Sequence, residues 1–88
     1  MNDLSPTLAE IKTIKSKHEG ALLKKRNVVG IGIGFKEIGG HRTDQLSLIV
    51  MVEKKVPAKK LKPKDRISPH IDGIPTDVKA VGVIKALG

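Results

Sequence analysis

The sequence contains no cysteine, tryptophan or tyrosine, and its one phenylalanine is Phe35. Without cysteine the chain can form no disulfide, no thiolate metal site and no cysteine nucleophile, as is common in a reducing compartment. With a single aromatic side chain, the core must be packed from Ile, Val and Leu. No apolar run approaches the about 18 residues that span a bilayer, and we therefore expect no membrane association.

The opening stretch, "MNDLSPTLAEIKTIK", also lacks the apolar core of a secretory signal, because acidic residues and lysines interrupt it. This absence predicts a cytoplasmic protein. The 88 residues are enough for one small domain, which buries roughly 60% of the surface of its unfolded chain. We expect residues 1–88 to form that single domain.

The formal net charge is +8, and it is unevenly distributed along the chain. Residues 1–26 carry a net charge of +3 and residues 53–66 carry +5, whereas residues 27–52 and 67–88 are balanced. This distribution is typical of a solvated surface over an apolar sheet, and equally of a surface that binds anions.

Residues 7–26 have the pattern of an amphipathic helix. Thr7 and Glu10 have the spacing of a capping box. The residues of one face of the predicted helix recur at steps of three and four, and they are Leu8, Ile11, Ile14, His18 and Leu22. Gly20 is a weak point, at which the helix could bend or end.

Three segments have strand patterns, at residues 27–38, 45–56 and 74–83. The second is apolar on both sides and is predicted to be the central strand. The turn-forming stretch "IGGHRTD" joins it to the first strand, which indicates an antiparallel hairpin. The stretch "PAKKLKPKDRISPHIDG" predicts an ordered loop with one helical turn near residues 58–61. The order predicts an α+β fold, an N-terminal helix packed on a small, mainly antiparallel three-stranded sheet.

The first strand, "NVVGIGIGF", is unusual because glycine occupies every second position. Glycine weakens a strand, so its regular spacing indicates that one face must stay bare for close packing. We expect contact with a second copy or a partner protein there, since apolar side chains on this face would be exposed in one copy. In the alternative, the N-terminal helix covers the glycines and the opposite face meets the neighbour. The candidate interface residues are Gly30, Gly32, Gly34, Ile49 and Met51.

The basic segment "EKKVPAKKLKPKDR" is the strongest candidate for recognition of an anion. Its cations could contact phosphates and give salt-dependent binding, although no aromatic residue accompanies them for base stacking. The candidate anion-binding residues are Lys54, Lys55, Lys59, Lys60, Lys62, Lys64 and Arg66.

The sequence gives little support for a phosphate-binding loop, a metal site or a catalytic triad. The glycine run matches neither G-x-G-x-x-G nor G-x-x-x-x-G-K-[ST], the two phosphate-binding patterns. The three histidines, at positions 18, 41 and 70, lack metal-ligand spacing. A constellation of His41, Asp44 and either Ser47 or Ser68 can be written, but neither serine has an elbow-like setting. We expect no cofactor, no metal and no catalytic residue.

Several stretches match, in order, a pattern of known proteins: Asn27 to Lys36, Val52 to Pro57, Asp65 to Ile67 and Ile71 to Val78. With them the chain resembles the N-terminal region of a family of uncharacterised bacterial trypsin-like serine peptidases. In that family the catalytic triad belongs to a chymotrypsin-like domain farther along the chain. None of the histidines here matches the family's catalytic histidine, so the resemblance implies a non-catalytic region.

Two hypotheses follow for function. The first is a small, non-catalytic, basic module for protein interaction or assembly, acting as a homo-oligomer or with a partner protein. The alternative is a protein that binds nucleic acid or another polyanion, such as an anionic nucleotide, through the basic residues between positions 54 and 66.

Overall fold

The computed structural model describes residues 6–82. It begins with helix α1 (Leu8–Leu23), which has the predicted capping box. The Thr7 hydroxyl accepts a hydrogen bond from the Glu10 N–H at 3.2 Å, and the Glu10 carboxylate accepts one from the Thr7 N–H at 3.3 Å. The helix runs through Gly20 and ends before the predicted residue 26, because a turn at residues 24–27 redirects the chain into the sheet.

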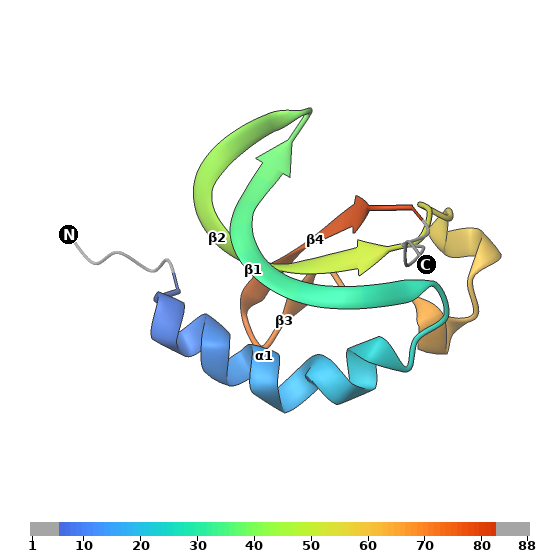
Figure 1. Cartoon of the computed structure of the whole chain (residues 1–88), viewed down its shortest axis with the longest axis horizontal. Coiled ribbons are helices and arrows are strands. Elements are labelled where there is room, and N and C mark those ends of the chain that lie inside the picture. Colours follow the sequence, from blue (N-terminus) through green and yellow to red (C-terminus); the bar gives the residue numbers. More distant parts are fainter. Residues whose placement is uncertain (1–5, 83–88) are drawn as a thin grey trace, which may run out of the picture.

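The sheet has four strands, β1 (Val28–Ile38), β2 (His41–Val52), β3 (His70–Ile71) and β4 (Ile74–Ala80), in the order β1-β2-β4-β3 (Figure 1). Strand β2 pairs antiparallel with β1 and parallel with β4, and β3 pairs antiparallel with β4. The predicted α+β class and central position of the second strand are confirmed. The predicted number of three strands is wrong, because a fourth, two-residue strand pairs with β4. Two of the three strand pairings are antiparallel, as predicted, and the third is parallel.

Two tight turns explain why β2 starts early and why the strand β3 was not predicted. β2 also ends at Val52, before the predicted end at residue 56. Gly39 and Gly40 have φ of 58° and 81°, and they join the paired residues Ile38 and His41 directly. A two-residue turn of this kind leaves no room for the loop expected before residue 45, so β2 starts at His41. A second turn of the same kind creates β3, since Asp72 and Gly73 have φ of 49° and 81°. Strand β4 ends at Ala80, and the predicted end at residue 83 lies outside the described residues.

The core lies between α1 and one face of the sheet. Ile11 of the helix packs with Leu48 of β2 and Ile74 of β4, all at most 4% exposed. Five half-buried side chains surround this cluster: Ile14, Ile31, Ile33, Leu46 and Ile71. The helix therefore covers the β-branched face of β1, and the alternative in which it covers the glycines is wrong.

The opposite, glycine-bearing face is covered by neighbouring side chains of the same sheet. A Cβ on Gly30 would lie 2.9 Å from the Met51 Cε, and a Cβ on Gly34 would lie 3.3 Å from the Ile49 Cγ1. Ile49 is only 9% exposed in the single chain, so the expectation that it would be exposed in one copy is wrong. The glycines leave room for these two side chains on this face, which is called here the curled face because the hairpin of β1 and β2 curls (Figure 1).

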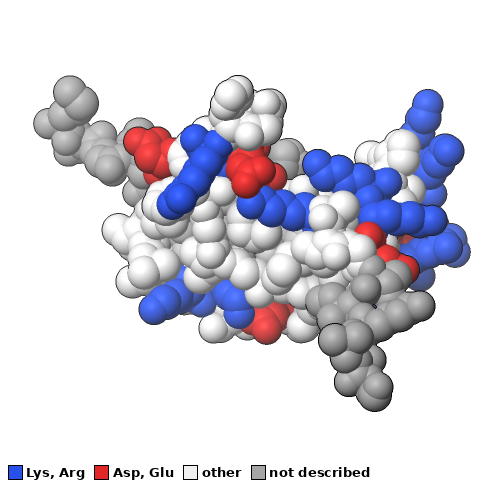
Figure 2. Space-filling view, turned by 45° about the horizontal axis from the view of Figure 1, so that its top comes forward, with Lys and Arg blue, Asp and Glu red and all other residues white. Residues whose placement is uncertain are grey.

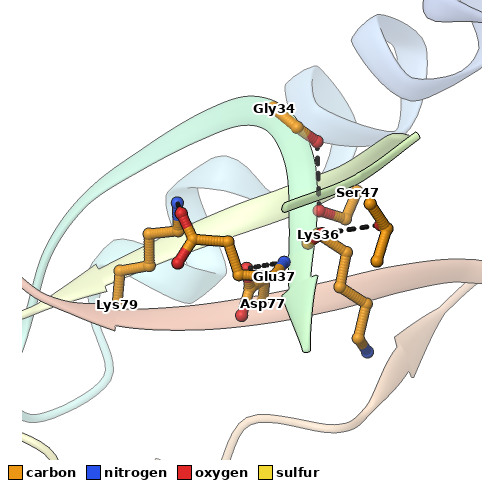
Figure 3. Close-up of polar contacts among 7 residues, drawn as sticks. Gly34, Lys36, Glu37, Ser47, Asp77 and Lys79 are labelled. Atoms are coloured by element: carbon orange, nitrogen blue, oxygen red, sulfur yellow. Dashed lines mark hydrogen bonds and ion pairs between the residues drawn. The ribbon is translucent and has the colours of Figure 1, made fainter. Parts of the chain in front are cut away.

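The end of the curled hairpin reaches β4 on this same face. The Glu37 N–H donates to the Asp77 carboxylate at 3.0 Å, and Lys79 forms an ion pair of 3.0 Å with the Glu37 carboxylate (Figure 3). Lys36 donates to the Thr76 carbonyl oxygen at 3.3 Å. A bulge between Phe35 and Glu37 interrupts the ladder just before these contacts, and bulges bend the strand that carries them.

The connection from β2 to β3 is irregular but ordered. It contains two short 3-10 helices, η1 (Ala58–Lys60) and η2 (Pro63–Asp65), of which the first confirms the predicted helical turn. Leu61 and Ile67 are half-buried beneath it. Among the described residues, no helix has the length and apolar character needed to cross a membrane.

Candidate functional site

The lysine-rich segment of residues 53–67 is fastened to the start of β1 by Asn27. The Asn27 side-chain amide donates to the Lys54 carbonyl oxygen, and its Oδ1 accepts from the Lys54 N–H at 3.1 Å. The Asn27 carbonyl accepts from the Glu53 N–H at 2.9 Å. Asn27 has φ of 77°, a left-handed conformation that asparagine tolerates better than most residues. This residue therefore both turns the chain and holds the segment.

A second set of contacts fixes the far part of the same segment. The Asp65 carboxylate accepts from the Arg26 N–H at 3.0 Å, and Lys25 donates to the Lys64 carbonyl. The Arg66 Nε donates to the carbonyl oxygens of Ala58 at 2.8 Å and Leu61 at 3.2 Å, which closes the segment on itself. The segment is thus held at both ends against the turn at residues 24–27.

Between this segment and the end of the sheet lies an open groove of about 270 Å³, called here the end groove. Its floor is aliphatic, formed by Val28, Val52, Val56, Ala58, Leu61, Ile67 and Val78. Its polar lining consists of Arg26, Asn27, Lys54, Lys55, Asp65 and Arg66. A second depression of about 400 Å³ adjoins it and is also lined by Glu53 and Lys60. The result is an apolar pocket with a mainly cationic rim.

The structure divides the predicted anion-binding residues into two groups. Lys54, Lys55, Lys60 and Arg66 line the end groove or the adjoining depression, whereas Lys59, Lys62 and Lys64 are exposed on the outer side of the segment. Lys64 borders a separate depression with Lys24 and Lys25. Figure 2 shows the resulting concentration of Lys and Arg at the end of the molecule that carries this segment.

The candidate interface residues lie together on the curled face, and the pair Gly30 and Met51 comes next in the register to the groove-lining pair Val28 and Val52. Gly30 pairs with Met51, Gly32 with Ile49 and Gly34 with Ser47. Ser47 is fully buried and donates to the Gly34 carbonyl at 3.1 Å (Figure 3). The Ser47 hydroxyl thereby links β1 and β2. Contact of this face with a second copy stays a prediction.

The histidines lie in three different places. His41 begins β2 at the hairpin turn and His70 begins the short strand β3. The His18 Nε2 lies 2.8 Å from the Asp72 carboxylate, which Lys17 also approaches to 3.4 Å. Hydrogen bonds from His18 and Lys17 lower the pKa of Asp72 below the ordinary aspartate value. In residues 6–82 no group of three or more His, Cys, Asp or Glu side chains is placed to hold a metal ion.

Sequence reasoning missed Arg26, Asn27 and the aliphatic floor of the end groove. The floor could not be foreseen, because it combines one residue of β1, one of β2, one of β4 and several of the connecting segment. The turn at Asn27 could have been predicted from the sequence. Asn27 lies between the basic end of the helix and an apolar strand, where asparagine commonly adopts a left-handed turn conformation.

One helix on a mixed four-stranded sheet, with a lysine-rimmed groove at the end of the sheet, defines a small basic α+β domain. Residues 4–84 match the model of the NARROW LEAF 1 N-terminal domain, and the chain belongs to this family. The resemblance to the N-terminal region of bacterial trypsin-like peptidases is thereby corrected, since the stretches that suggested it, from Asn27 to Val78, lie inside this match. No curated protein matches the chain.

Proposed function

We propose that this domain is a non-catalytic protein-interaction module that takes up a segment of its partner in the end groove. The observation that carries the proposal is the groove itself, an aliphatic pocket of about 270 Å³ with exposed cations around it. Pockets with an apolar floor and a few polar groups at the edge are the usual form of a binding site. The hydrogen bonds of Asn27, Asp65 and Arg66 preorganise its wall, which lowers the entropic cost of binding.

The surroundings of Ser47, one of the two serines considered as a nucleophile, favour a non-catalytic role. A serine nucleophile needs an accessible hydroxyl next to a general base. Ser47 is fully buried and donates to a backbone carbonyl of β1. We expect the purified protein not to hydrolyse casein or an ester substrate. Hydrolysis that co-purifies with the protein and is lost in His41→Ala would contradict this part of the proposal.

Selection of peptides from a random display library on the immobilised protein tests the interaction function. We expect enriched peptides which, when titrated into ¹⁵N-labelled protein, shift the backbone amide signals of Val28, Val52 and Leu61. The signals of Ala9 and Glu10 at the start of α1, which do not line the groove, serve as an internal control and should stay in place. Failure to enrich any peptide, or shifts confined to the start of α1, would contradict the proposal.

Binding of nucleic acid is the second candidate, because lysines gather at one end of the molecule (Figure 2). Lysines in solvent attract any polyanion, and such binding weakens steeply as salt rises. Under our proposal, fluorescence anisotropy with a labelled single-stranded oligonucleotide shows weak binding that disappears at physiological salt. Tight binding that persists at high salt would instead establish nucleic acid as the ligand.

A further inference from the structure

Building on the proposed function, we infer that the segment bound in the end groove carries an aliphatic side chain flanked by carboxylates. The floor and the rim of the groove select different features of the ligand. The aliphatic floor selects an apolar side chain and the cationic rim selects carboxylates, and together they specify an acidic peptide segment.

The floor demands an aliphatic side chain. Val28, Val52 and Val78 come from the ends of three neighbouring strands, and Val56, Leu61 and Ile67 from the segment that covers them. A cavity of about 150 Å³ lined by such side chains takes up a molecule of the size of benzene. A volume of about 270 Å³ is therefore sufficient for one or two leucine-sized side chains.

The rim demands negative charge. Arg26, Lys54, Lys55 and Lys60 are all exposed around the opening. Of the two carboxylates that line the groove and the adjoining depression, Asp65 is already engaged by the Arg26 N–H, and Glu53 lies on the side of the adjoining depression. Electrostatic complementarity across an interface raises association rates and fixes orientation, so a ligand with carboxylates beside its aliphatic anchor fits this rim.

The lining favours a peptide over a nucleic acid. Bases are held by stacking on aromatic rings or on free guanidinium planes. No aromatic residue lines the end groove, and Phe35 of β1 lies elsewhere, with the Arg42 guanidinium 4.5 Å from its ring centre. Two of the rim cations are arginines, Arg26 and Arg66, and the other three, Lys54, Lys55 and Lys60, are ammonium groups that offer no plane for stacking. The groove thus offers an aliphatic contact and mainly point charges.

Three acetylated and amidated peptides test the two demands separately. The first, EEDLLDEE, has both features; EEDSSDEE keeps the charge without the anchor, and QQNLLNQQ keeps the anchor without the charge. We expect the first to bind at least about tenfold more tightly than either other peptide in ¹⁵N chemical-shift titrations, which corresponds to about 1.4 kcal/mol. Equal binding of the two acidic peptides would overturn the inference, and so would tighter binding of a twelve-residue oligothymidylate at physiological salt.

A pair of variants localises the binding. Ala58 is exposed and lines the groove, so Ala58→Glu places a carboxylate at the anchor site without disturbing the core. Lys62→Gln changes the net charge by the same amount on the outer side of the segment. We expect Ala58→Glu to weaken binding of EEDLLDEE about tenfold and Lys62→Gln to change it less than twofold. Equal loss in the two variants would show a response to total charge only and would overturn the inference.

The outcome of the library selection separates this inference from the function on which it rests. Enriched peptides that shift the groove signals but lack acidic residues would overturn the inference and leave the interaction function standing. If no peptide is enriched, both are overturned, since the inference rests on the interaction function.

Discussion

Asn27 performs two tasks that no other residue type performs together at its position. Its backbone adopts a left-handed conformation between α1 and β1, while its side chain bonds both backbone groups of Lys54. Glycine would adopt the conformation without the bonds. Most other residues would be strained by about 1–2 kcal/mol and would also lose the bonds.

We therefore expect Asn27→Ala to lower the free energy of unfolding by about 3–4 kcal/mol, since strain of about 1–2 kcal/mol adds to the loss of two hydrogen bonds worth about 1 kcal/mol each. Asn27→Gly should cost only about 1–2 kcal/mol, because it relieves the strain. Urea unfolding at 25 °C measures both values. If both variants are as stable as the wild type, Asn27 does not hold the segment.

Asp72 links the turn between β3 and β4 to the helix through His18 and Lys17. These hydrogen bonds lower the pKa of its carboxyl in the folded state. A carboxyl with a lowered folded-state pKa adds stability above its unfolded-state pKa of about 3.9, and this contribution disappears as the pH falls through the folded-state value.

We expect the wild-type protein to lose thermal stability relative to Asp72→Asn as the pH falls from about 6 to about 2.5. Asparagine preserves the left-handed turn conformation, so the comparison isolates the charge. The difference in melting temperature between the two proteins at each pH is the readout. A difference that does not change with pH would show that the ionised carboxylate adds nothing.

At the scale of elements, the packing of side chains on the curled face of the β1–β2 hairpin explains why Gly30, Gly32 and Gly34 alternate along β1. The three glycines are not equally close to their neighbours. A Cβ at Gly34 would meet the Ile49 Cγ1 at 3.3 Å, whereas a Cβ at Gly32 would meet only the flexible Met51 Cε, at 3.7 Å. The need for glycine is therefore greatest where a buried, branched side chain packs against the strand.

We predict that Gly34→Val lowers the free energy of unfolding by about 1–3 kcal/mol, as is usual for overpacking. Gly32→Ala should leave it unchanged or raise it by up to about 1 kcal/mol, because alanine restricts the unfolded chain. Thermal and urea unfolding of the two variants test the order. A Gly34→Val protein more stable than Gly32→Ala would show that the contact with Ile49 does not limit the strand.

The elements that the sequence predicts well are those with local signals. The capping box of Thr7 and Glu10, the central position of β2 and the helical turn at η1 follow from patterns within a few residues. The short strand β3 had a local signal as well, since Asp72-Gly73 is a typical two-residue hairpin turn. The end groove and the covering of the glycines by Ile49 and Met51 depend on contacts between strands, which no single stretch of sequence displays.

At the scale of the whole molecule, association of copies through the curled face stays a prediction. With Ile49 already buried, Met51 is the half-buried apolar side chain that such an association could still use. We expect Met51→Gln to lower the average mass in sedimentation equilibrium at high protein concentration while the far-ultraviolet circular dichroism is preserved. A wild-type protein that is monomeric at every concentration would contradict the prediction.

The pairing of β2 with β1 on one side and β4 on the other also determines the order in which the strands of one chain pair during folding. β2 meets β1 across a two-residue turn, but it meets β4 only after the chain has passed through residues 53–73. Closing so long a loop is entropically slower than forming a hairpin. Because Val28, Val52 and Val78 come together only when β4 has docked, an intermediate consisting of the hairpin has no groove. A partner in the groove would therefore recognise only the finished fold, and its binding would slow unfolding rather than speed folding.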